Sequence, residues 1–396
     1  MKKIVIDARM YGLENTGIGR YIINLIKNLV RQPADRIENL RIILLVKKEK
    51  LGEIKKDLGD NFEYVAVRAK HYSFAEQIEI PLILHKIQPD LAHFLHFNAP
   101  LFYRGKLVIT IHDLIKHYST GKETTTRASF FYWLKFFIYK FLVNSVVKRA
   151  KLIFVPTNFW KKELVKKFRI NPKKIKVTYE AVDESFIKEA GKNTEVSLKK
   201  YGLKKPLFVY TGNVYPHKNL RILLQALKKM PWVNLAVVCS RSVFTERMQK
   251  LSKEFHLEDR VKFLGFVDDK NLTGLYRQAA ALVHPSLMEG FGLTGLEAAA
   301  CGCPVVSSNA SCLPEVYKDA VLYFNPYDAD DLVKKMKMVL KNKELRKELV
   351  KKGKKLVGEY SWKKMAEETV QGYREVLGIR NNQKRYEMWE THLPDF

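Results

Sequence analysis

Two glutamates, Glu289 and Glu297, flank a glycine-rich stretch whose residue types suit a ligand with both phosphates and hydroxyls. Gly290 and Gly292 allow the backbone to approach a ligand closely, and the helix predicted after Gly292 leaves its first amides without partners. Such amides bind phosphate groups. Because carboxylates repel phosphate, we expect the two glutamates to face hydroxyl groups. A nucleotide sugar meets both requirements; the alternative is a plain loop with one solvated and one helix-capping glutamate.

Lys218 is a candidate for binding the same phosphates from another part of the chain. It follows a predicted strand over residues 207–210 and a turn that contains Gly212 and Pro216. A lysine just beyond a strand is well placed to neutralise a diphosphate leaving group as a point charge. The alternative is that Lys218 is one more exposed lysine in a lysine-rich chain.

The chain resembles the retaining glycosyltransferases of family 4, and specifically their mannosyltransferase-like members, from Ile6-Asp7-Ala8-Arg9 to Ser361-Trp362. This resemblance implies the GT-B fold, an α/β architecture in which two Rossmann-like, doubly wound domains face a central cleft. It also implies that Glu289 lies at the donor sugar and that Glu297 binds the ribose hydroxyls. Other donor contacts implied by the same motif are Gly290, Phe291, Gly292, Leu293 and Thr294.

The resemblance also implies roles for two segments of the N-terminal half. Gly17, Ile18 and Gly19 match the family's first loop, which approaches the donor phosphates, although a turn needed only for packing would look the same. His112 matches a histidine that contacts the donor sugar. The alternative is a core histidine beside a helix-capping Asp113.

Further expected contacts lie in both halves of the chain. Asn213 stands where the family has an arginine or another polar residue, so it would offer a hydrogen bond in place of a charge and leave more of the developing charge to Lys218. Phe266 and Val267 lie in a loop expected to hold the nucleobase through backbone groups. Glu180 departs from the small loop of most relatives, and we assign it no role. The acceptor-side candidates are His96, Asn98 and Asp113.

Predicted strands and helices alternate along the chain, which is typical of parallel, doubly wound sheets that bind ligands at the carboxyl ends of their strands. A chain of 396 residues is also long enough for two domains. We expect residues 1–190 to form an N-terminal, acceptor-side domain and residues 191–205 to form a linker. Residues 206–360 should form the nucleotide-sugar-binding domain, and residues 361–396 a helix that crosses back, followed by a tail.

The formal net charge of +28 indicates attraction to polyanions. No known nucleic-acid-binding motif is present, so nucleic acid is not an expected partner. Residues 129–149 combine aromatic residues with lysines, which is typical of a helix that lies on an anionic membrane surface. A helix buried against the sheet or a partner subunit fits the same pattern.

Cysteine usage and the N-terminal sequence favour a cytoplasmic protein, peripheral on the inner face of the cell membrane if residues 129–149 bind lipid. The N-terminus lacks a signal-peptide pattern. All four cysteines lie in apolar or small-residue contexts that favour reduced thiols, namely Cys239, Cys301, Cys303 and Cys312.

The sequence therefore predicts transfer of a hexose from a nucleoside diphosphate sugar to a hydroxyl of a saccharide or lipid-linked acceptor. The resemblance favours GDP-mannose, leaves UDP-sugars open, and implies retention by a front-face route. Lys218, Glu289 and His112 are the candidate catalytic residues, acting through electrostatic stabilisation and positioning. No cofactor is expected, and no metal, because no Asp-x-Asp motif lies at a suitable strand end. The alternatives are a nucleotide-sugar epimerase and a non-catalytic polyanion-binding module.

Overall fold

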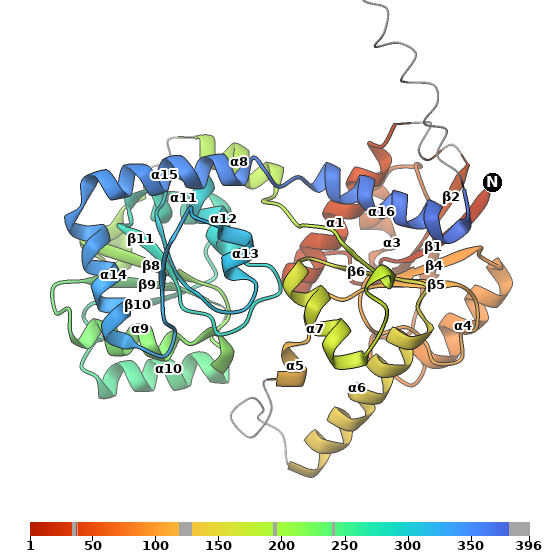
Figure 1. The fold of residues 1–396 in the computed structure, drawn as a ribbon, viewed down its shortest axis with the longest axis horizontal. Coiled ribbons are helices and arrows are strands. Elements are labelled where there is room, and N and C mark those ends of the chain that lie inside the picture. Colours follow the sequence, from red (N-terminus) through yellow and green to blue (C-terminus); the bar gives the residue numbers. More distant parts are fainter. Residues whose placement is uncertain (34–36, 38, 119–128, 193–195, 240–241, 380–396) are drawn as a thin grey trace, which may run out of the picture.

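The computed structural model describes residues 1–33, 37, 39–118, 129–192, 196–239 and 242–379, which form two α/β domains side by side (Figure 1). In the described part of the chain, the first domain contains a parallel sheet of order β3-β2-β1-β4-β5-β6-β7. Its strands are β1 Lys2–Asp7, β2 Leu40–Lys47, β3 Glu63–Val67, β4 Leu91–Phe94, β5 Leu107–Thr110, β6 Leu152–Val155 and β7 Ile175–Val177. The central strands β4, β5 and β6 are buried throughout, as expected for a parallel sheet covered on both faces.

The second domain repeats this plan with a parallel sheet whose described strands have the order β10-β9-β8-β11-β12-β13. They are β8 Leu207–Thr211, β9 Asn234–Val238, β10 Val261–Gly265, β11 Ala281–His284, β12 Val305–Ser308 and β13 Leu322–Phe324. Strand β8 pairs with both β9 and β11, so the chain changes direction across the sheet between these strands. In doubly wound sheets, ligands bind where the strand order reverses. The loops after β8 and β11 are therefore the segments to inspect.

Helices connect the strands and cover the sheets (Figure 1). Those associated with the first sheet are η1 Leu13–Asn15, α1 Thr16–Val30, η2 Lys48–Lys50, α3 Leu51–Leu58, α4 Glu76–Ile87, α5 Ile115–Tyr118, α6 Ser129–Arg149, α7 Asn158–Phe168 and η4 Pro172–Lys174. The remaining ones are α8 Glu184–Gly191, η5 Leu198–Tyr201, η6 Pro216–Lys218, α9 Leu220–Lys228, α10 Val243–Glu254, α11 Asp269–Gln278, α12 Leu293–Ala300, α13 Leu313–Tyr317, α14 Ala329–Lys341, α15 Lys343–Val357 and α16 Trp362–Leu377.

The last helix, α16, leaves the second domain after α15 and packs on the first (Figure 1). Its buried residues Trp362, Met365 and Tyr373 join the core formed by β1, α1 and β6. The Tyr373 hydroxyl lies 2.6 Å from His93 Nδ1 on β4. A Cβ at Gly372 would lie 2.7 Å from side-chain atoms of the first sheet, so glycine permits this close packing. The expected tail at 381–396 lies outside the described residues.

One expectation about local structure was wrong. Gly17, Ile18 and Gly19 are not in a loop, because α1 already begins at Thr16. Glycine is a poor helix former, but a Cβ at Gly19 would clash with the Gly12 carbonyl, so packing requires glycine there. Helix α8 ends at Gly191, the first residue of the expected linker, and packs against α11 and α12. The domain bounds themselves stay a prediction.

Candidate active site

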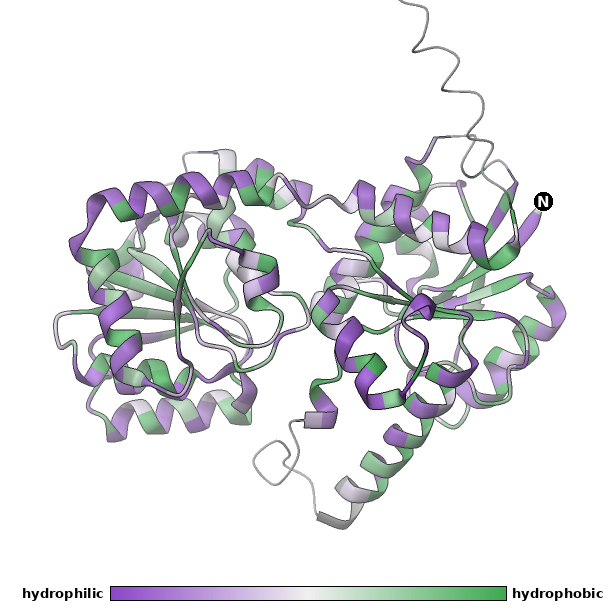
Figure 2. Cartoon of the chain, in the orientation of Figure 1, coloured by the Kyte–Doolittle hydropathy of each residue, from purple (hydrophilic) through white to green (hydrophobic). Residues whose placement is uncertain are grey.

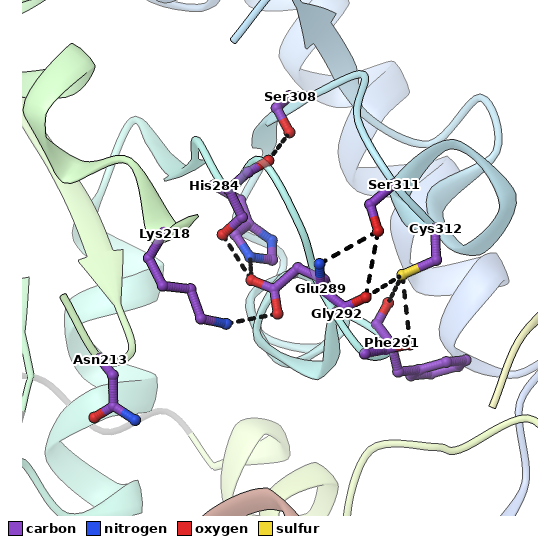
Figure 3. Close-up of polar contacts among 12 residues, drawn as sticks. Asn213, Lys218, His284, Glu289, Phe291, Gly292, Ser308, Ser311 and Cys312 are labelled. Carbon is purple, nitrogen blue, oxygen red and sulfur yellow. Dashed lines mark hydrogen bonds and ion pairs between the residues drawn. The ribbon is translucent and has the colours of Figure 1, made fainter. Parts of the chain in front are cut away.

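Glu289 lies in a cluster of polar side chains after β11, and Lys218 contacts it directly (Figure 3). The Lys218 Nζ atom lies 2.6 Å from Glu289 Oε2. The other carboxylate oxygen, Oε1, accepts from Ser286 Oγ at 2.6 Å and lies 2.7 Å from His284 Nε2. Burial would by itself raise the pKa of Glu289, but Lys218 and His284 outweigh this effect and hold that pKa well below its usual range. Glu289 is therefore a fixed anion.

Tyr317 connects this cluster to the start of α12. Its hydroxyl lies 2.8 Å from His284 Nδ1, donates to the Gly292 carbonyl at 2.6 Å and accepts from the Gly295 amide at 3.1 Å. Gly292 has a φ of +106°, a conformation that L side chains rarely adopt. A Cβ at Gly295 would clash with the Tyr317 hydroxyl. Consequently both glycines are needed to hold Glu289 and the helix start in one hydrogen-bonded unit.

The start of α12 offers the amides that the sequence predicts for phosphate binding. The helix begins at Leu293, directly after its N-cap Gly292. The amides of Leu293 and Thr294 therefore have no acceptor within the helix, and the helix N-terminus carries partial positive charge. Four residues before this helix, Glu289 holds the Lys218 ammonium. The arrangement can bind an anionic group next to a hydroxyl-bearing one.

Glu297, about one turn into α12, contacts the other domain. Its Oε1 atom forms an ion pair with Nη1 of Arg20 on α1, a residue 277 positions away in the sequence. Only 8% of the Glu297 side chain is exposed. Burial raises the pKa of Glu297, and the positive charge of Arg20 reduces that rise. The second glutamate of the motif is thus placed where the two domains meet.

The Glu289 loop also lies against the first domain. Trp160 Nε1 on α7 donates to the carbonyls of Glu289 and Gly290 at 3.0 and 2.9 Å. A Cβ at Gly290 would lie 3.2 Å from the His112 carbonyl oxygen and 3.8 Å from Asp113 Oδ2. The segment after β5 and the loop after β11 are therefore in contact. This contact brings His112 and Glu289 to the same region of the protein.

The side chain of His112 has a protein oxygen close to each of its ring nitrogens. Nε2 lies 3.1 Å from the Leu95 carbonyl oxygen, and Nδ1 lies 3.5 Å from Glu180 Oε1. The Tyr21 ring packs edge-on against the imidazole at a centroid distance of 4.6 Å. Glu180, to which we could assign no role, is buried and fixes the orientation of the candidate sugar-binding histidine.

The acceptor-side candidates Asp113 and His96 have different environments. Asp113 Oδ1 accepts from the Ile115 amide at 2.9 Å and so caps the start of α5. The His96 ring stacks on that of His112 with centroids 6.5 Å apart, and its Nδ1 atom lies 3.1 Å from the Tyr72 hydroxyl. His96 is therefore close to the candidate site, whereas one carboxylate oxygen of Asp113 is occupied in capping the start of α5.

Asn98 belongs to a buried charged network in the first domain. Its amide nitrogen donates to both carboxylate oxygens of Glu76, at 2.7 and 2.6 Å. Arg9 forms ion pairs with Glu76 at 2.5 Å and with Asp7 at 2.6 Å. Within the described residues, Asp7, His71 and Glu76 are a group with the spacing of metal ligands, but the Arg9 guanidinium already pairs with both of its carboxylates. The Asn98 amide is thus occupied by Glu76.

The expected nucleobase loop follows β10. Phe266 is 89% exposed, whereas Val267 packs against the core of the second domain. The backbone between β8 and η6 is fixed by the Tyr210 hydroxyl, which donates to the Asn213 carbonyl at 2.6 Å. Figure 3 shows the Asn213 and Lys218 side chains on the same side of the Glu289 loop.

Two family models match most of the chain. Residues 15–186 match the model described as Glycosyltransferase Family 4, and residues 193–356 match the one described as Glycosyl transferases group 1. The chain belongs to the family 4 glycosyltransferases. The predicted family and enzyme class are thereby confirmed.

Curated relatives and solved structures agree with this assignment. O-antigen chain mannosyltransferase B of Escherichia coli is 28% identical over 391 residues, covering 94% of this chain and 99% of the relative. O-antigen chain mannosyltransferase RfbU of Salmonella typhimurium is 32% identical over 235 residues, covering 57% of this chain and 63% of the relative.

Sucrose-phosphate synthase from Thermosynechococcus elongatus has a TM-score of 0.73 at 18% identity, covering 96% of this chain and 100% of that structure. HepE of Anabaena in complex with UDP and glucose has a TM-score of 0.67 at 17% identity, with the same coverage. The predicted GT-B fold is thus confirmed.

The structure of this glycosyltransferase also contains contacts that our reading of the sequence missed. Glu315 on α13 reaches across to α7 of the first domain. Its two carboxylate oxygens accept from the Asn158 and Phe159 amides at 2.7 and 2.8 Å. A carboxylate at the N-terminus of α7 also interacts favourably with the helix dipole.

The other residues with unforeseen contacts at the site are Arg20, Trp160, Glu180, His284, Ser286 and Tyr317. His284 and Ser286 stand directly before Glu289, and this proximity in sequence is the one signal that pointed to them.

Proposed function

We propose that this glycosyltransferase transfers mannose from a nucleoside diphosphate sugar, GDP-mannose in preference to a UDP-sugar, to a hydroxyl of a saccharide or lipid-linked acceptor in polysaccharide synthesis. The contact that carries the proposal is the Lys218–Glu289 ion pair before the start of α12. In this arrangement an ammonium group and the first amides of α12 lie close to a carboxylate. The ammonium and the amides suit a diphosphate, and the carboxylate suits sugar hydroxyls. The two O-antigen mannosyltransferase relatives support mannose, and the HepE complex supports a nucleotide donor.

In the proposed reaction, the bond between the anomeric carbon and the diphosphate oxygen breaks while the acceptor hydroxyl attacks from the same face. The acceptor proton passes to the departing phosphate, and the configuration is retained because attack and departure take place on the same face. Lys218 and the α12 amides stabilise the negative charge that develops on the leaving group. Glu289 and His112 position the sugar, and Glu180 orients His112. Glu297 binds the ribose hydroxyls.

We assign the donor to the second domain, over residues 206–360, and the acceptor to the first, over residues 1–190. The other donor contacts in this assignment are Gly17, Ile18, Gly19, Asn213, Phe266, Val267, Gly290, Phe291, Gly292, Leu293 and Thr294. Gly17 supports the assignment, because a Cβ there would meet no atom within 4 Å, so packing does not explain its glycine. Gly19, by contrast, is required by packing.

The reaction is tested by incubating the purified enzyme with GDP-mannose, UDP-glucose or UDP-galactose and a set of saccharide acceptors. We expect a mannosylated product with GDP-mannose, formed equally well in the presence of EDTA. Loss of activity in EDTA that manganese restores would contradict metal independence. Conversion of the donor sugar without any acceptor would instead indicate an epimerase, and an inert donor with every acceptor would contradict the proposed reaction.

We further propose that α6 binds an anionic membrane surface, where a lipid-linked acceptor would be found. The helix extends away from the body of the first domain (Figure 1), and Figure 2 shows hydrophobic residues along this extension. In its C-terminal half Val143, Val146 and Val147 are fully buried. Earlier in the helix, large hydrophobic side chains are exposed, namely Trp133, Leu134, Phe137, Ile138 and Phe141. Exposed lysines accompany them, as in interfacial helices. No helix in the described residues has the length and hydropathy needed to cross a membrane.

We expect the double substitution Phe137→Asp and Phe141→Asp to abolish this binding. Each phenylalanine is 63% exposed, so the change should leave the fold intact. Burying one such side chain contributes about 1.5–3 kcal/mol, so losing two should weaken vesicle binding more than about a hundredfold. Co-sedimentation with phosphatidylglycerol vesicles measures it. Tyr327→Asp is the matched control, since Tyr327 is 81% exposed on the second domain. Failure of the wild-type protein to bind these vesicles at low salt would contradict the proposal.

A further inference from the structure

The ion pair between Arg20 and Glu297 joins a residue of the first domain to a proposed nucleotide ligand of the second. Arg20 directly follows Gly19 in the first turns of α1. In the described part of the chain, its guanidinium is the one side-chain group that bonds the Glu297 carboxylate. A buried carboxylate without a partner is costly. Arg20 therefore satisfies Glu297 while no nucleotide is bound.

Arg20 is surrounded by more negative charge than it can neutralise. Burial acts to lower its pKa, but Glu297, Asp269 and Asp183 together outweigh burial and raise it. Asp183 is held in place, since its Oδ2 atom accepts from Asn24 on α1 at 3.2 Å. Three carboxylates from separate segments thus keep the guanidinium at the domain interface, and α12 lies beside it.

The nucleotide and Arg20 require the same carboxylate. A ribose diol that uses both Glu297 oxygens must displace Arg20 from Oε1, so in that geometry the ribose and Arg20 compete for this oxygen. Leu293 and Thr294, whose amides would hold the diphosphate, lie three to four residues before Glu297 on α12. That separation is only about 6 Å along a helix axis, which an arginine side chain can span.

We propose that Arg20 is a donor-binding residue that pairs with Glu297 in the empty enzyme and moves to the diphosphate when the ribose takes that carboxylate. This inference rests on the proposed function, because it needs a nucleotide at α12. Arg20 would then supply the diphosphate with a second cation in addition to Lys218. Its origin in the first domain would also couple donor binding to the contact between the domains.

Isothermal titration of guanosine, uridine, GDP and UDP into the wild type and Arg20→Ala tests the inference. A nucleoside has the ribose but no phosphate. It therefore competes with Arg20 for the Glu297 carboxylate but has no diphosphate that Arg20 could bind. We expect Arg20→Ala to bind the cognate nucleoside several-fold more tightly. The same variant should bind the diphosphate about tenfold to a hundredfold more weakly, the range for hydrogen bonds to charged groups. A purely structural role would shift both affinities in the same direction.

Arg31→Ala is the matched control, because Arg31 ends the same helix and pairs with Glu184 at 3.2 Å in an exposed position. It should leave all affinities unchanged. Equal changes for nucleoside and diphosphate, or no change in either, would overturn the inference. Arg20→Gln, with thermal melting as a check on folding, replaces the alanine variant if that variant does not fold. Wild-type enzyme that binds neither GDP nor UDP would overturn the proposed function itself, and the inference with it.

Discussion

Replacing Glu289 with glutamine is expected to lower the rate of sugar transfer by about two to three orders of magnitude, the range seen when one preorganised polar group is removed from an active site. Glutamine keeps the size of the side chain but removes its charge. The carboxylate accepts from Ser286 and lies against His284 and Lys218, so an amide in its place would put an NH₂ group toward one of these donors. The sugar hydroxyls would then lose an acceptor of fixed position.

Steady-state kinetics with saturating GDP-mannose measures this effect, and nucleotide titration separates it from donor binding. Because Glu289 is proposed to contact the sugar, Glu289→Gln should bind GDP almost as tightly as the wild type. Glu63→Gln is the control, since Glu63 is half-exposed on β3 and pairs with Arg41 far from the site. Transfer by Glu289→Gln at the wild-type rate would remove Glu289 from the mechanism.

Lys218→Ala is expected to lower the rate of transfer by a similar two to three orders of magnitude, and to weaken diphosphate binding as well. The ammonium has two roles in the proposed mechanism. It stabilises the charge that develops on the leaving group, and it holds the buried Glu289 carboxylate at 2.6 Å. Without Lys218 the pKa of Glu289 should rise, since burial would then be opposed chiefly by His284.

The pattern across ligands distinguishes Lys218 from Glu289. Lys218→Ala should bind GDP more weakly but guanosine normally, whereas Glu289→Gln should bind both normally. Lys218→Arg should recover part of the lost activity, because it restores the charge with a different geometry. Lys229→Ala serves as the control, since Lys229 is a half-exposed lysine of the same domain that pairs with Asp330. Equal loss in Lys229→Ala would show that bulk charge, and not the site, is responsible.

Much of the fold could be read from the sequence because parallel strands are buried on both faces. The strand predicted over residues 207–210 is β8, which spans Leu207–Thr211 and so differs by one residue at its end. Continuous apolar runs identify such strands without information about residues far away in the sequence. The start of α1 was predicted wrongly for the opposite reason. Glycine has a low helix propensity, so the local sequence does not favour a helix there. The close contact of Gly19 with the Gly12 carbonyl, which requires glycine, is a packing contact that the local sequence does not reveal.

The candidate site divides in the same way. Glu289, the glycines and the start of α12 lie within one short stretch, so their spacing in the sequence is enough to predict that they lie close together. Residue types and a family resemblance then sufficed to name Lys218 as a partner. By contrast, Glu180 had no expected role, and its contact with His112 spans two separate loops. Glu315 on α13 likewise contacts the start of α7, which is 157 residues away in the sequence.

By itself the sequence determined the two parallel sheets, the helix start after Gly292 and the identity of its flanking acids, because each depends on neighbouring residues and their local conformation. Only the tertiary structure decided which groups face one another across the two domains. Arg20 and Glu297 are separated by 277 residues, and no local pattern carries information about such a pair. Their contact depends on how the two domains pack, which is settled by the summed shape and charge of the surfaces that meet.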